Sequence, residues 1–571
     1  MHRPHRPSER ILRRHPLHRR AGAVRMAAAV GACAGLALVV VPAVAGPSPQ
    51  RTVRIRVTSK GEPNGSSASP RMSGDGRYVA FATAATNLGR PDPNGHVEDV
   101  YLYDDKSAAI ILLSSPPGGS GADGPSSDPA ISGDGSVVAF SSRATNLVPR
   151  ANNVVPGATP HADVFAWSRD GGLQQVSLSS TQVPADGDSS EPDVSGDGHR
   201  VVFSSTASNL PGGHPDGQRD VYVRDLSTAQ TLLVSATPDG PPGDGSSSAP
   251  AISPDGRYVS FATRATNLVA GMTTHGTNVV IRDLETGTTE LASVSSPGTP
   301  QAGGPAPVSP PASDVSAGGR YVVFESGATN LVPGDTNRKT DLFVRDRTAH
   351  RTVRASLATT DQQADGGSFG PSISPDGRYV TFSSAAPNLT PGQPRGANAF
   401  VRDLVRHTTV LADASSAGRP RSGEQSGSVS GQASSADDGS QVAFVSSARN
   451  LVAGKRSRVA DVFLRRLIPP PIAVAASTAG LSRGHVVISF FSADRQAGPL
   501  LCRLDHTARA VCPLGAVVLP LLSPGKHVLT AYAGGPGSAY ATRPTTVRIT
   551  VRRGGRARIK VTNPGAALGF G

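Results

Sequence analysis

The stretch that decides the fold is Ser73-Gly74-Asp75-Gly76-Arg77-Tyr78-Val79-Ala80-Phe81, because its pattern returns six more times. The Asp-Gly pair is typical of a tight turn, since Asp bonds back to the chain and Gly accepts a positive φ. The largely apolar run after the turn predicts a strand that is buried on both faces. The closing aromatic residue recurs every 58 to 63 residues, at Phe81, Phe140, Phe203, Phe261, Phe324, Phe382 and Phe444. A fixed period of this size indicates repeated supersecondary units.

Each unit is predicted to contain four strands. A short apolar strand precedes the tight turn, and the strand ending in Phe follows it. An Asn-Leu pair comes six residues later, and then two further strands, such as 341–346 and 352–357 in the fifth unit. Four antiparallel strands make one propeller blade. The sequence therefore predicts an all-β protein with a seven-bladed β-propeller.

The two ends of the repeat array predict how the ring closes. The seventh unit lacks a fourth strand, because the chain runs into Pro469-Pro470-Pro471 after the third. The stretch 51–58 precedes the first unit and has the pattern of a spare fourth strand. We expect this spare strand to pair with the seventh unit, so that no sheet is left with an open partner.

The repeat resembles the WD40-like repeats of the TolB-type propeller family, whose blades carry Ser-Pro-Asp-Gly before a strand ending in Phe. The fourth and sixth copies match this pattern at Ser253-Pro254-Asp255-Gly256 and Ser374-Pro375-Asp376-Gly377. The fifth copy lacks the Asp, and the seventh has Ala436 in place of Ser. The resemblance covers about residues 51–467 and implies a propeller that works outside the cytoplasm. It transfers no partner, because a fold does not carry its function with it.

The first 45 residues are predicted to be an export segment. A basic stretch precedes an apolar run from Met26 to Ala45, and Ala43-Val44-Ala45 is typical of a signal-peptide cleavage site. The alternative is an uncleaved anchor, since about 20 apolar residues can span a bilayer. We therefore expect an extracytoplasmic protein, secreted or associated with the cell envelope, whose one possible membrane contact is this segment.

The predicted domains are the export segment (1–45), the propeller (46–468), a small β-sandwich (469–553) and a disordered basic tail (554–571). Short strands bounded by turns follow the proline linker, as in a sandwich. Their order resembles that of bacterial immunoglobulin-like modules. Cys502 and Cys512 are an even pair in a protein bound for an oxidising compartment, so we predict a disulfide between them.

The formal charge of +13 does not indicate a nucleic-acid-binding protein. Residues 1–45 and 543–571 each carry +7, which leaves the long middle of the chain near neutral. A surface that follows a phosphate backbone needs a clustered basic face, so nucleic acid is disfavoured. We expect a monomer that binds a protein or polysaccharide of the cell envelope.

The sequence yields no catalytic residues, cofactor or zinc site. Gly366-Gly367-Ser368-Phe369-Gly370 has the letters of a nucleophile elbow, but it precedes a strand and not a helix. Two loops carry oxygen ligands at spacings that suit calcium, although such residues are also ordinary in turns. These weak calcium candidates are Asp92, Asn94 and Asp99 in the first unit, and Asp335, Asn337 and Asp341 in the fifth.

Four acids recur before Gly in the loops that enter blades two, three, four and six. They are Asp123, Asp186, Asp244 and Asp365. A cation-attracting ring is one interpretation of these acids. The other, which we favour, is that each acid caps its own turn.

The predicted function is non-catalytic binding through the face that gathers the long loops, together with the channel mouth. Variable loops on a rigid scaffold are the usual place for binding. The alternatives are a hydrolase or lyase whose site is assembled across blades at the channel mouth, and a purely structural envelope protein. A cluster of carboxylates, His and Arg with perturbed pKa values at the channel mouth would favour the enzyme.

Overall fold

The computed structural model describes most of the propeller and the strands of the C-terminal region. The described residues are 52–55, 61–88, 94–119, 121–149, 161–269, 272, 276–301, 311–393, 396–422 and 433–467, followed by eight strands and Asp505. The predicted export segment lies outside them.

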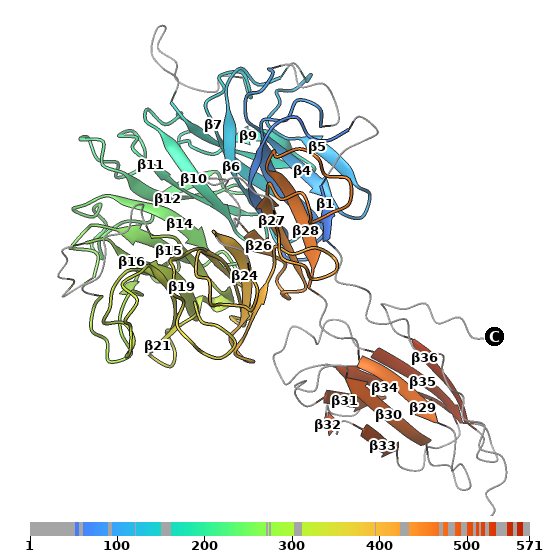
Figure 1. Cartoon of the computed structure of the whole chain (residues 1–571). Coiled ribbons are helices and arrows are strands. Elements are labelled where there is room, and N and C mark those ends of the chain that lie inside the picture. Colours follow the sequence, from blue (N-terminus) through green and yellow to red (C-terminus); the bar gives the residue numbers. More distant parts are fainter. Residues whose placement is uncertain are drawn as a thin grey trace, which may run out of the picture.

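Seven four-stranded antiparallel sheets form the propeller (Figure 1). The innermost strands are β2 (Ser67–Met72), β6 (Ser126–Ile131), β10 (Ser189–Val194), β14 (Ser247–Ile252), β18 (Ser313–Val315), β22 (Ser368–Ile373) and β26 (Ala433–Ser435). The second strands are β3 (Tyr78–Thr83), β7 (Val137–Ser142), β11 (Arg200–Ser205), β15 (Tyr258–Thr263), β19 (Tyr321–Ser326), β23 (Tyr379–Ser384) and β27 (Gln441–Ser446). The prediction of a seven-bladed, all-β propeller is confirmed.

The outer half of each blade is built from a third and a fourth strand. The third strands are β4 (Asp99–Asp104), β8 (Asp163–Ser168), β12 (Asp220–Asp225), β16 (Asn278–Asp283), β20 (Asp341–Asp346), β24 (Asn398–Asp403) and β28 (Asp461–Arg466). The fourth strands are β5 (Ala109–Leu112), β9 (Gly172–Gln175), β13 (Gln230–Leu233), β17 (Thr289–Leu291), β21 (Arg351–Arg354), β25 (Thr408–Leu411) and, for blade 7, β1 (Thr52–Arg54). The helical structure among the described residues is one 3-10 turn, Ala317–Gly319.

The ring is closed by chain-end overlap, as predicted. β1 pairs antiparallel with β28, with Val53 opposite Leu464, and Figure 1 shows the two side by side. The strand is shorter than the predicted stretch 51–58. Thr52 takes the place that Thr409 has in blade 6: its Oγ1 donates to the carbonyl of Ala414 at 2.6 Å, across the interface with the preceding blade.

The core lies between the blades. Each of the seven junctions between neighbouring blades holds an apolar cluster, such as the one that packs Val202 and Val221 of blade 3 against Phe261 and Val280 of blade 4. The repeated Phe of the second strand is buried in every blade. In six blades it stacks on an aromatic residue of the third strand, as Phe382 does on Phe400 with centroids 5.6 Å apart.

The C-terminal region forms two antiparallel sheets. One has the order β29-β30-β33 and the other the order β32-β31-β34-β35-β36. The strands are β29 (Ile472–Ser477), β30 (Val486–Ser492), β31 (Leu500–Leu504), β32 (Ala510–Cys512), β33 (Gly515–Leu519), β34 (Gly525–Tyr532), β35 (Thr545–Val551) and β36 (Ala557–Thr562). The immunoglobulin-like assignment stays a prediction.

The disordered tail predicted from residue 554 needs a correction. Ala557–Thr562 forms strand β36, which pairs antiparallel with β35. Its basic residues, Arg558 and Lys560, alternate with Ile559 and Val561, and this period of two suits a strand at the edge of a sheet. The net positive charge of this stretch favours disorder, whereas its alternation of basic and apolar residues favours a strand.

Candidate functional site: the axial channel

The repeated serine and aspartate of the tight turns have a structural role. In blade 1 the Ser73 hydroxyl donates to Asp75 Oδ1 at 2.6 Å, and the same oxygen accepts the N–H of Arg77 at 2.9 Å. Ser73 Oγ in turn accepts the N–H of Tyr78, which begins the second strand. The turn is thus held by its own side chains, as the sequence predicted.

Backbone hydrogen bonds also link successive turns around one mouth of the channel, with breaks after Pro254 and Pro375. The N–H of Gly133 donates to the carbonyl of Gly196 at 2.9 Å, and the N–H of Gly196 donates to that of Pro254 at 2.9 Å. The blades approach so closely here that a Cβ on Gly196 would lie 2.8 Å from the Pro254 oxygen. Proline has no N–H, so it accepts from the preceding blade but cannot donate to the next. After Pro254 the Asp255 carboxylate accepts the N–H of Gly318 at 2.8 Å instead.

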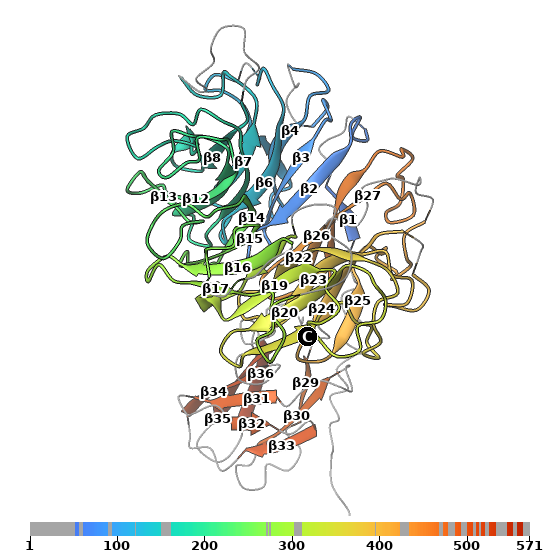
Figure 2. The ribbon, with the colours of Figure 1, turned by 90° about the vertical axis from the view of Figure 1, so that its left-hand side faces the viewer.

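A cavity of about 790 Å³ follows the axis of the ring. Its walls come from the innermost strands of all seven blades, and the tight turns line one end of it. Figure 2 shows inner strands such as β2, β6, β14, β22 and β26 gathered around the middle of the ring. The cavity therefore extends toward the turn side, whereas the sequence-based hypothesis placed binding on the long-loop side. Its volume is within the range of sites that bind small ligands.

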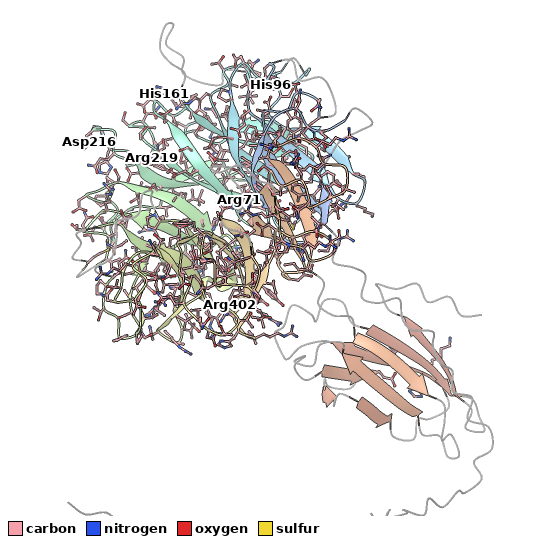
Figure 3. All side chains as sticks on the ribbon, in the orientation of Figure 1. Arg71, His96, His161, Asp216, Arg219 and Arg402 are labelled. Carbon is pink, nitrogen blue, oxygen red and sulfur yellow. The ribbon has the colours of Figure 1, made fainter. Side chains whose placement is uncertain are left out.

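One position in each inner strand forms a belt around this channel. It lies two residues before the first residue of the turn, and in blade order it is occupied by Arg71, Ala130, Asp193, Ala251, Asp314, Ser372 and Ser434, of which all but Ala130 line the cavity. The belt breaks the sevenfold repeat, because three blades place a charged residue where the others have a small one. Figure 3 shows Arg71 near the axis, with Asp216 at the periphery.

The two belt aspartates satisfy backbone groups that the edge strands leave open. Asp193 accepts the N–H of Ile252 in the next blade at 2.8 Å. Asp314 accepts the N–H of Ile373 in the next blade at 2.8 Å, and its other oxygen accepts that of Val315 at 2.8 Å. An inner strand has no further strand beside it, so such N–H groups need a side-chain partner.

Burial nevertheless disfavours the charged form of both aspartates. It raises the pKa of Asp193 to about 7, with the negative charge of Asp314 as a second cause. Burial likewise raises the pKa of Asp314, while its hydrogen bonds from the backbone and the positive charge of Arg71 act in the opposite direction. The channel thus contains a carboxyl group that titrates near neutral pH.

Two charged groups of the channel have no hydrogen bond or ion pair within the described ranges. They are the guanidinium of Arg71 and the carboxylate of Asp437, and both side chains are exposed. Asp437 stands where the other turns have Gly, Pro or Ala, and its carboxylate lies over Gly74. The exposed Asp437 carboxylate lies inside the channel mouth, where the surrounding protein removes part of its hydration; this desolvation, and then the negative charge of Asp438, raise its pKa to about 6.

The calcium candidates of blade 5 do come together, but around an arginine. Arg354 lies 3.1 Å from Asp335 and 3.6 Å from Asp341, and all three side chains are buried. Asn337 donates to Asp341 at 3.0 Å. A guanidinium therefore occupies the place of the expected cation.

The candidates of blade 1 are only partly described. Asp99 accepts a hydrogen bond from Ser114 at 2.6 Å, and the analogous pair recurs in blade 2 as Asp163 and Ser177. Asn94 is described, whereas Asp92 lies outside the described residues. Among the described residues no group of three His, Cys, Asp or Glu is placed to hold a metal ion.

Three of the four entry-loop acids, Asp123, Asp186 and Asp244, bind the following Asn-Leu loop through their carboxylates. Asp186 accepts the N–H and the hydroxyl of Ser208, each at 2.7 Å, and its own N–H donates to Asn209 at 3.1 Å. The side chain of Asn209 completes the brace by donating to the carbonyl of Pro184. Asp123 and Asp244 make the equivalent bonds to Thr145 and Thr266, and the N–H of Asp365 donates to Asn388. This explains why Asn repeats six residues after each Phe.

The other residues singled out in the sequence are the serine of the elbow-like stretch and the two cysteines. Ser368, of the elbow-like stretch, is buried at the start of β22 and donates to Ser384 at 2.9 Å. Cys502 and Cys512 lie on the paired strands β31 and β32, where Cys502 is opposite Ala510 and Cys512 is opposite Leu500. Their side chains are outside the described part of the protein, so the disulfide stays a prediction.

Sequence reasoning missed the belt and Asp437. The signal was present, because an alignment of the seven copies on their turns shows Arg, Ala, Asp, Ala, Asp, Ser and Ser at one position. This position varies from blade to blade, so the repeat pattern does not single it out.

Comparison with known proteins gives structural neighbours alone. No protein-family model matches the chain, and no curated protein matches it. TolB from Acinetobacter baumannii is 14% identical, with 70% of this chain and 78% of that chain covered and a TM-score of 0.34. An oligogalacturonate lyase in complex with manganese is 12% identical, covering 74% and 95%, with a TM-score of 0.43. The acylaminoacyl peptidase of Pyrococcus horikoshii is 11% identical, covering 74% and 57%, with a TM-score of 0.40.

The solved structures that the chain matches thus include TolB proteins, a lyase and a peptidase. The seven-bladed fold itself rests on the sheet topology above. Within the described residues, no helix is long and apolar enough to cross a membrane.

Proposed function

We propose that this protein is an exported binding propeller that takes a ligand of the cell envelope, protein or polysaccharide, into the turn side of its axial channel. The observation that carries the proposal is the cavity of about 790 Å³ whose lining departs from the sevenfold repeat. Positions that only hold the blades together repeat, as Ser73 and Asp75 do. Arg71 and Asp437 do not repeat, and within the described residues neither side chain makes a hydrogen bond or an ion pair.

Export is proposed from the basic and apolar segment at residues 1–45. A binding role without catalysis fits the two belt aspartates, since both already accept backbone N–H groups. A carboxylate that already accepts a backbone hydrogen bond from the next blade is less well placed to move a proton to and from a substrate.

The test blocks the channel after folding. Ser372→Cys places a thiol on the belt, and a maleimide carrying a short polyethylene glycol then fills the cavity. Thr228→Cys carries the same polymer on an exposed hairpin, and wild type treated with the reagent controls for the native cysteines. We expect fluorescent protein to bind arrays of envelope glycans and peptides unless Ser372→Cys is blocked. Equal array binding by the blocked and unblocked forms would contradict a channel site.

A second candidate is acid–base catalysis in the same cavity, as in a hydrolase or lyase. It is favoured by the pKa of Asp193, which burial raises to about 7, together with the nearby charge of Arg71. A general acid or base works best when its pKa is close to the ambient pH. The test is turnover of fluorogenic polysaccharide fragments by wild type and Asp193→Asn. Turnover that is lost in the variant and follows a pKa near 7 identifies the enzyme.

A further inference from the structure

The charged groups of the channel divide into those that have partners and those that do not. Asp75 accepts bonds from Ser73 and Arg77, and Asp438 accepts the N–H of Ser440 at 2.9 Å. Asp193 and Asp314 are occupied by the backbone of the next blade. Arg71 and Asp437 remain available to a ligand within the described part of the channel.

These two groups have opposite charge and lie in one cavity. Asp437 of blade 7 lies over Gly74, because a Cβ built on that glycine would be 2.3 Å from its Oδ2. Gly74 follows Arg71 by three residues, and three residues of chain span at most roughly 10 Å. The backbone of Arg71 and the backbone of Gly74, beneath Asp437, therefore lie within the length of a short peptide of each other.

We propose that the channel binds a zwitterionic ligand, a peptide of two or three residues with free ends, whose carboxylate contacts Arg71 and whose ammonium group contacts Asp437. This inference rests on the proposed function and names its substrate class. A guanidinium presents a planar fork of N–H groups that matches a carboxylate.

The rest of the lining selects for the same ligand. Asp75, Asp376 and Asp438 surround Asp437, so the turn-side mouth is negative and favours an ammonium group there. A ligand with only negative groups is repelled by these acids. A ligand with only positive groups offers the Arg71 guanidinium no carboxylate and is repelled by its charge.

The experiment uses calorimetric titration of the full chain with four peptides. The probes are tri-alanine, N-acetyl tri-alanine, tri-alanine amide and the doubly capped peptide. The variants are Arg71→Gln and Asp437→Asn, with Arg351→Gln and Asp216→Asn as matched controls at exposed positions outside the cavity. Both test positions are exposed, and far-UV circular dichroism with a melting curve checks that each variant folds.

We expect tri-alanine to bind at least tenfold more tightly than either singly capped form. Arg71→Gln removes the difference between tri-alanine and its amide, while Asp437→Asn removes the difference between tri-alanine and its N-acetyl form. Equal binding of all four peptides, or no binding of any, overturns the zwitterion proposal. If array binding still depends on an open channel in that case, the proposed function stands and only the ligand class is wrong.

Discussion

The guanidinium of Arg402 in blade 6 donates a hydrogen bond from Nη1 to the carbonyl of Ala358, in the segment that leaves blade 5, over 2.8 Å. The same nitrogen donates to Thr409, and the side chain is 2% exposed. Burial lowers the pKa of the equivalent Arg224 and Arg282, and both make the same kind of contact with the preceding blade. Arginine clamps of this kind recur in blades 3 to 6.

Replacing Arg402 should therefore loosen the junction between blades 5 and 6. Arg402→Met leaves buried carbonyl oxygens and Thr409 without a donor, and we expect a loss of about 3 kcal/mol in the free energy of unfolding. Urea denaturation measures it, with the exposed Arg351→Met as control. A loss no larger than that of the control would contradict the clamp.

The closure of the ring depends on a buried ion pair. Lys455 Nζ lies 2.6 Å from Asp461, and both side chains are fully buried. Arg54 of β1 contacts the same aspartate at 3.4 Å, and it also contacts Glu62 at 3.3 Å. This cluster ties the N-terminal strand to blade 7.

Lys455→Met should destabilise the closed ring by about 3 to 5 kcal/mol, because it leaves a buried carboxylate short of charge. Limited proteolysis should then cut first near β1, and urea denaturation gives the size of the loss. Lys106→Met, at an exposed hairpin position, is the matched control. Cleavage that begins elsewhere at an unchanged rate would show that the ion pair does not hold the closure.

The hydrogen bonds of the entry-loop aspartates contribute less to the free energy of unfolding. Asp186→Ala removes two hydrogen bonds to Ser208 at a partly exposed site, so we expect a loss of about 1 kcal/mol in the free energy of unfolding. Hydrogen exchange should speed up locally at residues 184–210. Uniform exchange across the propeller would instead mean that the brace is not local.

Stability should fall as the pH rises from about 4 to 7. Burial raises the pKa of Asp163 to about 6, and of Asp193 and Asp413 to about 7. Such groups hold more protons in the folded than in the unfolded state, so raising the pH through this window weakens folding. The urea midpoint should be higher at pH 5 than at pH 8.

Below about pH 4 the stability should instead fall as the pH falls. The pKa of Asp283 is lowered to about 2 by its hydrogen bonds from Arg257, so its stabilising effect is lost as the pH falls below about 4. Asp193→Asn should reduce the difference between pH 5 and pH 8 but leave the loss at low pH unchanged. An unaltered difference would mean that Asp193 does not carry a raised pKa.

The architecture was predictable because its chemistry is local. The turn from Ser73 to Gly76 is held by hydrogen bonds within the turn. The strand before blade 1 supplies the fourth strand that the seventh repeat lacks. The site was not predictable in the same way. Asp193 and Ile252 are 59 residues apart, and which side chains share a channel depends on how the blades close around the axis.

The contacts of the entry loops also depend on residues that are distant in the sequence. Asp186 was predicted to cap its own turn, yet its partner lies 22 residues away on a loop that the fold brings back. Arg354 could not be assigned to the acids of the blade-5 loop, because no spacing rule connects residues 335 and 354.

A tyrosine begins the second strand in four of the seven blades, three residues before the closing Phe, and it packs against the next blade. Tyr258 of blade 4 lies against Gly319 of blade 5, and Tyr321 lies against Gly377 of blade 6, where a Cβ would be 2.1 Å from its ring. Blades 4, 5 and 6 each offer a ring to the bare glycine of the next blade. A second copy of blade 5, inserted whole beside the first, would therefore meet a tyrosine on one side and a glycine on the other, whereas a larger residue at either glycine needs a matching change in the ring that faces it.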